Sequence, residues 1–166
     1  MSTMKQAYQS AGVARYYFDE VVPCDLWRGQ KKSAQKSGEF ILQPVTVEVE
    51  LITANGRRVR APDVEVFTKN GMEWIRGCRT IRHGGAHWGI SCWSEPPKFA
   101  LLGGWANFKI PKDAPIPDAL AVTQDDDNQA KRYHYSIAPK DDMPLALFIQ
   151  HLKELAKHIV IWEENV

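Results

Sequence analysis

Three short stretches of the sequence each place a chemically capable side chain in an apolar or alternating run. Arg28 lies in "LWRG", Ser91 in "HWGISCW" and His134 in "YHYSIAP". A guanidinium can bind phosphate through paired hydrogen bonds, a hydroxyl can bind a sugar, and an imidazole can exchange a proton near neutral pH. We expect each stretch to be the end of a strand, and together they predict a binding site for a phosphate-bearing ligand.

Each of these residues also has a simpler structural interpretation. Arg28 can be a surface arginine in a salt bridge, because most arginines are exposed and have no further role. His134 can be a half-buried histidine with a satisfied hydrogen bond. The local patterns alone do not choose between these roles and the functional ones.

The composition limits the kinds of partner that the chain can attract. Of the 166 residues 44% are hydrophobic and 25% are charged, which is typical of a single soluble globular domain, residues 1–166. The 21 Lys and Arg nearly balance the 20 Asp and Glu, for a formal charge of +1. This charge argues against a nucleic-acid or anionic-membrane partner, so any anion site must be local.

The three cysteines, Cys24, Cys78 and Cys92, are expected to be thiols in a reducing compartment. Cys78, His83, His87 and Cys92 suit zinc by residue type, but their spacing fits no standard zinc motif, and we expect no metal. The amino terminus has no apolar stretch of signal-peptide length, and no window is apolar enough to span a membrane. We therefore expect a cytoplasmic protein, with possible export by a dedicated secretion system.

Hydrophobic patterning predicts mostly strands. Residues 45–51 alternate between apolar and polar and lead into Asn55-Gly56, a strong hairpin-turn signal. The tryptophan-rich residues 72–110 favour short twisted strands, and residues 133–138 alternate as a strand that Pro139 ends. The stretch "GQKKSAQKSGEF" is expected to be a solvated loop or frayed helix, and "IPKDAPIPDAL" an extended surface connection.

The last part of the chain predicts a helix. It starts at Pro144, with Asp142 available as a cap. Its apolar residues recur at helical spacing: Leu145, Phe148, Leu152, Leu155, Ile159 and Trp162. The predicted fold class is therefore α+β, with mostly strands and a packed carboxy-terminal helix.

An ordered set of motifs in the second half of the chain resembles a known toxin family. The set comprises Phe108–Pro111, Pro115 and Pro117, Gln124-Asp125 with Asn128, and "HYSI" at 134–137. Upstream, "RAPD" at 60–63, "GIS" at 89–91 and "LWRG" are similar to motifs of the same family. The family is that of the second numbered effector exported by the bacterial type VI secretion system, whose fold is of the ADP-ribosyltransferase type.

The resemblance implies an ADP-ribosyltransferase-like twisted antiparallel β core and an NAD-dependent toxin. Such a toxin cleaves the nicotinamide–ribose bond of NAD and transfers ADP-ribose to a macromolecule in the target cell, and it is paired with a cognate immunity protein. The implied catalytic residues are His134, Ser91 and Gln124, and the implied NAD-binding residues are Arg28, Ser91, Trp93, Asn128 and Tyr135. We expect the side chains of residues 28, 91 and 134 to converge around one dinucleotide-sized cleft.

The individual roles follow from the chemistry of NAD. Arg28 would bind the pyrophosphate, Ser91 would hold the nicotinamide ribose, and Trp93 or Tyr135 would stack on the cationic ring. His134 would accept a hydrogen bond from a ribose hydroxyl or orient the nucleophile. Gln124 and Asn128 can add amide contacts, or equally can cap a turn, and both aromatic residues can be plain core.

The sequence departs from the family pattern at two points. Ile90 stands where the family has threonine, so a hydroxyl is lost there, and neither Glu95 nor Glu163 and Glu164 lies in the glutamate motif that follows a strand in typical ADP-ribosyltransferases. Two alternatives therefore stay open. Water can be the acceptor, which makes the protein an NAD glycohydrolase, or the chain can be a non-catalytic module that binds a protein.

Overall fold

The computed structural model describes residues 16–31, 42–53, 56–60, 62–77, 89–96, 105–124 and 134–162. In this part of the chain every strand pair is antiparallel, and the strands form three sheets. One helix, α3 (Leu145–Ala156), accompanies them within the described ranges. The predicted fold class, an α+β protein with a twisted antiparallel core and a packed carboxy-terminal helix, is confirmed.

The largest sheet has seven strands in the order β1-β9-β10-β7-β2-β8-β12. In this spatial order the strands are β1 (Tyr16–Phe18), β9 (Leu120–Gln124), β10 (His134–Pro139), β7 (Ile90–Trp93), β2 (Leu26–Lys31), β8 (Trp105–Ile110) and β12 (Val160–Trp162). Their central members join segments far apart in the chain, because β7 lies between β10 and β2. The candidate residues at positions 28, 91 and 134 therefore lie on three neighbouring strands.

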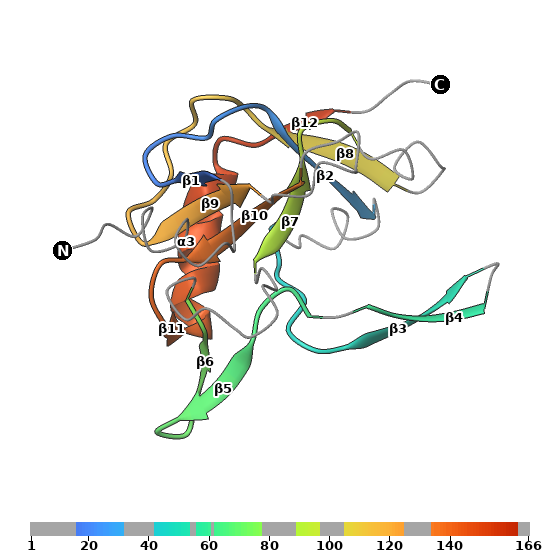
Figure 1. The fold of residues 1–166 in the computed structure, drawn as a ribbon, viewed down its shortest axis with the longest axis vertical. Helices are drawn as coiled ribbons and strands as arrows, with labels where there is room; N and C mark the ends of the chain where they lie inside the picture. The colour runs from blue at the N-terminus through green and yellow to red at the C-terminus, as the bar shows by residue number, and fades with distance from the viewer. Residues whose placement is uncertain are drawn as a thin grey trace.

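The two smaller sheets are built on hairpins, and Figure 1 shows both hairpins projecting from the body of the molecule. The first pairs β3 (Val49–Thr53) with β4 (Gly56–Arg60), with Thr53 opposite Gly56. This confirms the predicted hairpin, although its first strand begins at Val49 rather than at residue 45 and Asn55 lies outside the described residues. The tight turn suits Gly56, whose φ of 110° is rare for other residues.

The second hairpin, of β5 (Val66–Lys69) and β6 (Met72–Ile75), is extended by the short strand β11 (Met143–Pro144). Its turn residues Asn70 and Gly71 both have positive φ, 53° and 74°, which matches the right-handed twist of the strands. The helix α3 contacts β6 and β11. This three-stranded sheet therefore provides the surface on which the helix packs.

The carboxy-terminal helix is shorter than the sequence predicts. It ends at Ala156, so Ile159 follows the helix and Trp162 belongs to strand β12, which pairs with β8. The β-branched run from Ile159 to Ile161 favours a strand, and the hydrogen bonds to β8 outweigh the helical spacing of the side chains. The buried residues Phe148, Leu152 and Leu155 confirm the predicted apolar face.

The predicted cap of this helix is also wrong. The N-cap is Pro144 and makes no side-chain hydrogen bond, while Asp142 binds elsewhere. Its carboxylate accepts the backbone N–H of Gly77 at 2.8 Å and a hydrogen bond from Arg76 at 3.1 Å. Asp142 therefore ties the start of α3 to the end of β6 instead of capping the helix.

One hydrophobic core joins the sheets and the helix. Its completely buried members come from β2, β6, β7, β8, β9, β10 and α3, and the connection 111–119 adds Ala114 and Ile116. Residues 111–119 contain no long element, as the prolines predict. The N–H of Val22 donates to the carbonyl of Ala114, and the N–H of Asp113 donates to the carbonyl of Val22, both at 2.9 Å. Among the described residues, no helix is long and apolar enough to cross a membrane.

Candidate active site

The polar residues that were expected at strand ends lie mostly inside strands. Arg28 is the third of six residues in β2, Ser91 the second of four in β7, and His134 the first of six in β10. Strand β2 does not stop after Arg28, because residues Gly29 to Lys31 continue its ladder with β8. The expectation of three strand ends was therefore wrong for Arg28 and Ser91.

The register divides the candidate residues between the two faces of the sheet. Trp27 is opposite Trp93, which is opposite His134, so these three side chains share one face with Ser91. We call this the polar face. The other, apolar face carries Arg28, Gln124 and Tyr135 together with the buried core residues Leu26, Cys92, Phe108 and Val122.

The three side chains of the expected cleft thus do not leave the sheet on one side. Arg28 starts from the apolar face, whereas Ser91 and His134 start from the polar face. Asn128 lies outside the described residues, so the structure does not test its place. β2 and β7 do not pair regularly beside Arg28. How Arg28 lies relative to Ser91 and His134 depends on this irregular pairing.

The ladder between β2 and β7 opens immediately beside Arg28. It consists of the single pair Trp27 and Trp93, whereas β2 and β8 pair along six residues. In a continued ladder the backbone of Ser91 would lie opposite Gly29. Instead, Nη1 of Arg28 donates to the backbone carbonyl of Ser91 at 2.8 Å. The guanidinium therefore fills the opening between the strands and meets Ser91 through its backbone, not through its hydroxyl.

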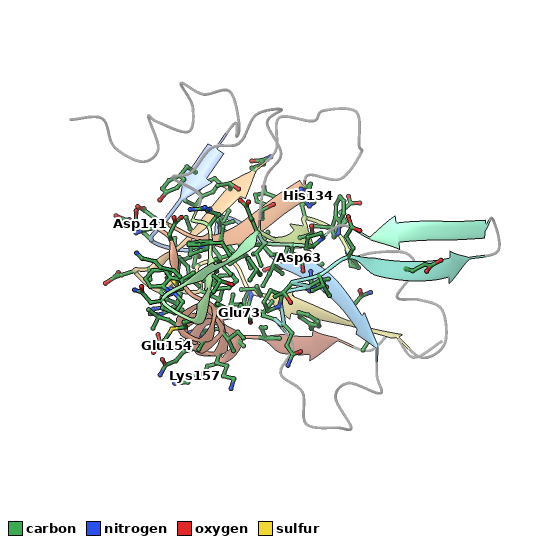
Figure 2. All side chains as sticks on the ribbon, turned by 90° about the horizontal axis from the view of Figure 1, so that it is seen from below. Asp63, Glu73, His134, Asp141, Glu154 and Lys157 are labelled. Atoms are coloured by element: carbon green, nitrogen blue, oxygen red, sulfur yellow. The ribbon has the colours of Figure 1, made fainter. Side chains whose placement is uncertain are left out.

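Asp63 faces the same guanidinium. Its Oδ2 lies 4.0 Å from Nη2 of Arg28, and the two side chains are 7% and 13% exposed respectively. Oδ2 also accepts the backbone N–H of Val45 at 2.7 Å. Figure 2 shows Asp63 and His134 on the side of the molecule from which the β3–β4 hairpin projects, with Glu154 and Lys157 on the opposite side, at the end of α3.

A row of rings and a cation crosses the polar face. The rings of Trp93 and His134 meet edge to face with centroids 4.6 Å apart, and Nζ of Lys109 lies 5.4 Å from the centroid of Trp27. Since Trp27 and Trp93 are directly opposite, the row runs from His134 to Lys109 across four strands. All four side chains are only partly buried, so each leaves some surface exposed to solvent.

A row of hydroxyl groups lies one step further along β7 and β10 and continues across β9 and β1. Ser91 is opposite Ser136, which is opposite Thr123, and Thr123 is opposite Tyr17. Ser136 and Thr123 are buried, while Ser91 at the end of the row is half-buried. Of these hydroxyl groups, that of Ser91 is the one next to both the aromatic row and the opening at Arg28.

Two candidate residues are poorly placed for contact with a ligand. Tyr135 is 6% exposed and Gln124 is 7% exposed, and they are opposite each other on the apolar face. Burial raises the pKa of the Cys24 thiol, and a side-chain hydrogen bond with Tyr135 opposes this rise. Tyr135 therefore makes a structural contact to the loop before β2, and Trp93 is the better placed of the two aromatic candidates.

The cysteine beside Arg28 is not an activated nucleophile. Burial raises the pKa of the Cys92 thiol to about 12, although the Arg28 cation lowers it and the Asp63 carboxylate raises it further. A thiol with such a pKa is fully protonated at neutral pH and hence unreactive. Cys24 and Cys92 are free thiols, as predicted, and Cys78 lies outside the described residues.

Of the four residues considered as a zinc set, the structure describes Cys92. Among the described residues, no group of three or more His, Cys, Asp or Glu side chains is arranged to hold a metal ion. Three members of the weighed zinc set, Cys78, His83 and His87, lie outside these residues. Glu95 is exposed just after β7, and Glu163 and Glu164 are also outside.

The described part of the chain also contains a shallow groove of about 320 Å³ away from the candidate residues. Pro115, Ile116 and Pro117 line it on one side, and Asp118, Glu154 and His158 complete it. Its carboxylates would repel a pyrophosphate. The opening beside Arg28, which offers a cation, is the better place for such a ligand.

Reasoning from the sequence missed two residues of this region. Trp27 precedes Arg28 in "LWRG", and its place beside Trp93 follows only from the pairing of β2 with β7. Asp63 ends the "RAPD" stretch, which the resemblance had singled out as a motif without a role for its acid. The position of Asp63 within this motif could therefore have indicated a role for its carboxylate.

Comparison with models of protein families gives a match over most of the chain. A family model described as "Tse2 ADP-ribosyltransferase toxin" matches residues 4–161, nearly the whole chain. No curated protein sequence gives a significant match. The matched region contains every candidate residue described above.

Proposed function

The chain belongs to the Tse2 ADP-ribosyltransferase toxin family, and from this premise we propose that it cleaves the bond between nicotinamide and ribose in NAD and transfers ADP-ribose to a macromolecule of the target cell. The observation that carries the proposal is the opening between β2 and β7. Arg28 donates there to the backbone carbonyl of Ser91, and Trp93, two residues further along β7, contacts His134 of β10; all four residues are only partly buried.

The proposed reaction breaks the bond between C1′ of the ribose and the ring nitrogen of nicotinamide, which leaves as a neutral base with the bonding electrons. The ribose then carries positive charge in the transition state, and an atom of the acceptor forms the new bond to C1′ and loses its proton. A site for this reaction must hold the diphosphate and the nicotinamide ring apart and orient the acceptor.

Arg28 is the proposed ligand of the pyrophosphate. One nitrogen of its guanidinium is already bound to Ser91, but the group carries several further N–H donors in a fixed plane. Its position inside the opening lets these donors serve a ligand that enters between the strands. Because the net charge of the chain is near zero, attraction of a dianion depends on local cations such as Arg28.

The aromatic row is the proposed binding surface for the nicotinamide ring. Trp93 would stack on the cationic ring, which is attracted by the face of an indole. His134 packs against Trp93 and would take the proton of the acceptor or hold a ribose hydroxyl. The hydroxyl of Ser91, at the end of its row and nearest the opening, would bind the nicotinamide ribose.

The remaining parts of the proposal come from family membership. We propose that the protein is delivered by a type VI secretion system and that a cognate immunity protein masks it in the producing cell. Both would act through protein surfaces, and neither changes the chemistry above. NAD hydrolysis differs from transfer only in that water takes the place of the acceptor, so one experiment separates them.

The test is a time course with the purified protein, NAD labelled in its ADP-ribose part, and a cell lysate. Release of nicotinamide together with label on a macromolecule is expected. Nicotinamide release with all the label as free ADP-ribose would replace transfer by hydrolysis. No loss of NAD would leave the chain as a non-catalytic binder and reject the proposal.

The site is tested by three variants, Arg28→Ala, Ser91→Ala and His134→Ala. Each is expected to lower NAD turnover by at least about a hundredfold, the usual effect of losing a residue that acts in the transition state. Arg76→Ala and His158→Ala are matched controls, because Arg76 comes directly after β6 and His158 comes shortly after α3. Unchanged turnover in all three site variants would reject the assigned site.

A further inference from the structure

Asp63 is a buried carboxylate with no role in the chemistry proposed above. The residue is 9% exposed. Burying a carboxylate is costly unless hydrogen bonds and a nearby cation compensate for lost hydration. The contacts that provide this compensation therefore indicate what the residue does.

Asp63 is anchored by its own backbone on both sides. Its N–H donates to the carbonyl of Val45 at 2.7 Å, and the N–H of Val45 returns a bond of 2.7 Å to Oδ2 of Asp63. Its carbonyl accepts the N–H of Gly89 at 2.6 Å, immediately before β7. The carboxylate is thus fixed relative to the strand that carries Ser91.

Arg28 contacts both Asp63 and the segment to which Asp63 is anchored. Nη1 of Arg28 donates to the Ser91 carbonyl at 2.8 Å, and Nη2 lies 4.0 Å from Oδ2 of Asp63. Ser91 and Gly89 belong to one short segment, so both contacts hold the guanidinium against the same piece of chain. The opposite influences of Arg28 and Asp63 on the pKa of Cys92 agree with this arrangement around one buried thiol.

We propose that Asp63 is a positioning residue that orients the guanidinium of Arg28 for the pyrophosphate of NAD, an inference that rests on the proposed function. A guanidinium held at two of its nitrogens keeps its plane fixed, so the ligand does not have to restrict it on binding. Without the carboxylate, Arg28 keeps its charge but can rotate about its hydrogen bond to Ser91. Binding of NAD then weakens while the chemistry at C1′ is less affected.

The test is Asp63→Asn, measured by the steady-state rate of nicotinamide release. An asparagine oxygen can still accept the N–H of Val45, so the variant removes mainly the charge that faces Arg28. KM for NAD is expected to rise about tenfold, which corresponds to about 1.4 kcal/mol, with kcat changed by no more than about threefold. Asp63→Glu restores the carboxylate and is expected to recover at least part of this loss.

Asp142→Asn is the matched control. Asp142 likewise accepts a backbone N–H, from Gly77, and pairs with an arginine, Arg76, but it lies beside β6 and α3. The control is expected to keep the wild-type KM. A general loss of packing would lower the active fraction and hence kcat in either variant, whereas a positioning role changes KM in Asp63→Asn alone.

The outcomes separate the inference from the proposed function. If the wild-type protein releases nicotinamide and Asp63→Asn has the wild-type KM, the inference is overturned and the proposed function stands. If Asp63→Asn does not fold, Asp63→Ser takes its place, because it also removes the charge that faces Arg28, and a wild-type KM in that variant overturns the inference in the same way. If the wild-type protein does not use NAD, the proposed function is overturned and the inference with it.

Discussion

Replacement of Arg28 by alanine is expected to lower the free energy of unfolding by about 2–4 kcal/mol. This loss is independent of any effect on NAD. Arg28 supplies a hydrogen bond to a backbone carbonyl in the opening between β2 and β7, where the strand ladder provides none in its place. It also supplies the cation that faces the buried carboxylate of Asp63.

The magnitude follows from these two contacts. A hydrogen bond from a charged group contributes about 1.5–3 kcal/mol, and the 2.8 Å distance to the Ser91 carbonyl is short enough for the full effect. The ion pair contributes less, about 1 kcal/mol, because its atoms are 4.0 Å apart and Asp63 keeps the N–H of Val45 as a partner. For a domain of this size the sum corresponds to a decrease in Tm of roughly 4–16 °C.

The assay is urea unfolding followed by circular dichroism, with Arg76→Ala as the control. Arg76 also makes two ion pairs, at 3.1 and 3.8 Å, but its side chain is 37% exposed, so about 1 kcal/mol or less is expected. Equal stability of Arg28→Ala and the wild-type protein would refute the reasoning. It would mean that the contacts of the guanidinium with Ser91 and Asp63 do not stabilise the fold. A decrease as large in Arg76→Ala would show that burial is not what sets the effect.

Two further predictions concern residues on β7 or next to it. Gly89→Ala is expected to lower the free energy of unfolding in denaturant by about 1–3 kcal/mol. A Cβ at Gly89 would lie 2.8 Å from the backbone oxygen of Ile137, and no rotamer change can relieve this contact. Wild-type stability of the variant would show that β7 and β10 are not so close. Because the pKa of Cys92 is about 12 in the folded protein against 9.0 for an ordinary thiol, its contribution to stability is complete below pH 9 and is lost as the pH rises toward 12. Unfolding free energies measured between pH 8 and 11 are therefore expected to fall less steeply in Cys92→Ala, and parallel curves would contradict the assigned burial of the thiol.

Much of the fold could be predicted from local patterns. The alternation in residues 133–138 and the Asn55-Gly56 signal correspond to β10 and to the hairpin of β3 and β4. The apolar spacing from Leu145 to Leu155 correctly predicts α3, because its face is buried against one surface. The prediction failed beyond residue 156, where hydrogen bonds to a distant strand decide the structure and helical spacing continues by coincidence.

The candidate site was harder to predict, since it depends on pairing between distant segments. Within one strand, alternation tells that Trp27 and Arg28 face opposite sides, but only the register of β2 on β7 tells which of them lies beside Ser91. The motifs singled out Arg28, Ser91 and His134, and these residues lie on three neighbouring strands, as a single site requires. The motifs did not predict from which face of the sheet each side chain projects, or that Gln124 and Tyr135 are buried.

Polar groups gather beside Arg28 because the ladder between β2 and β7 ends there. The strands themselves do not end at this point. Where β2 and β7 separate after one pair, backbone groups lose their partners although both strands continue, and a side chain must take over. Arg28 does so from the apolar face, where its guanidinium meets the backbone carbonyl of Ser91, while Trp93 and His134 contact each other on the polar face of the neighbouring strands. The same contact that closes the fold at this point therefore supplies the charge on which the proposed NAD site depends, and this is why stability and turnover have to be measured separately in every variant of Arg28.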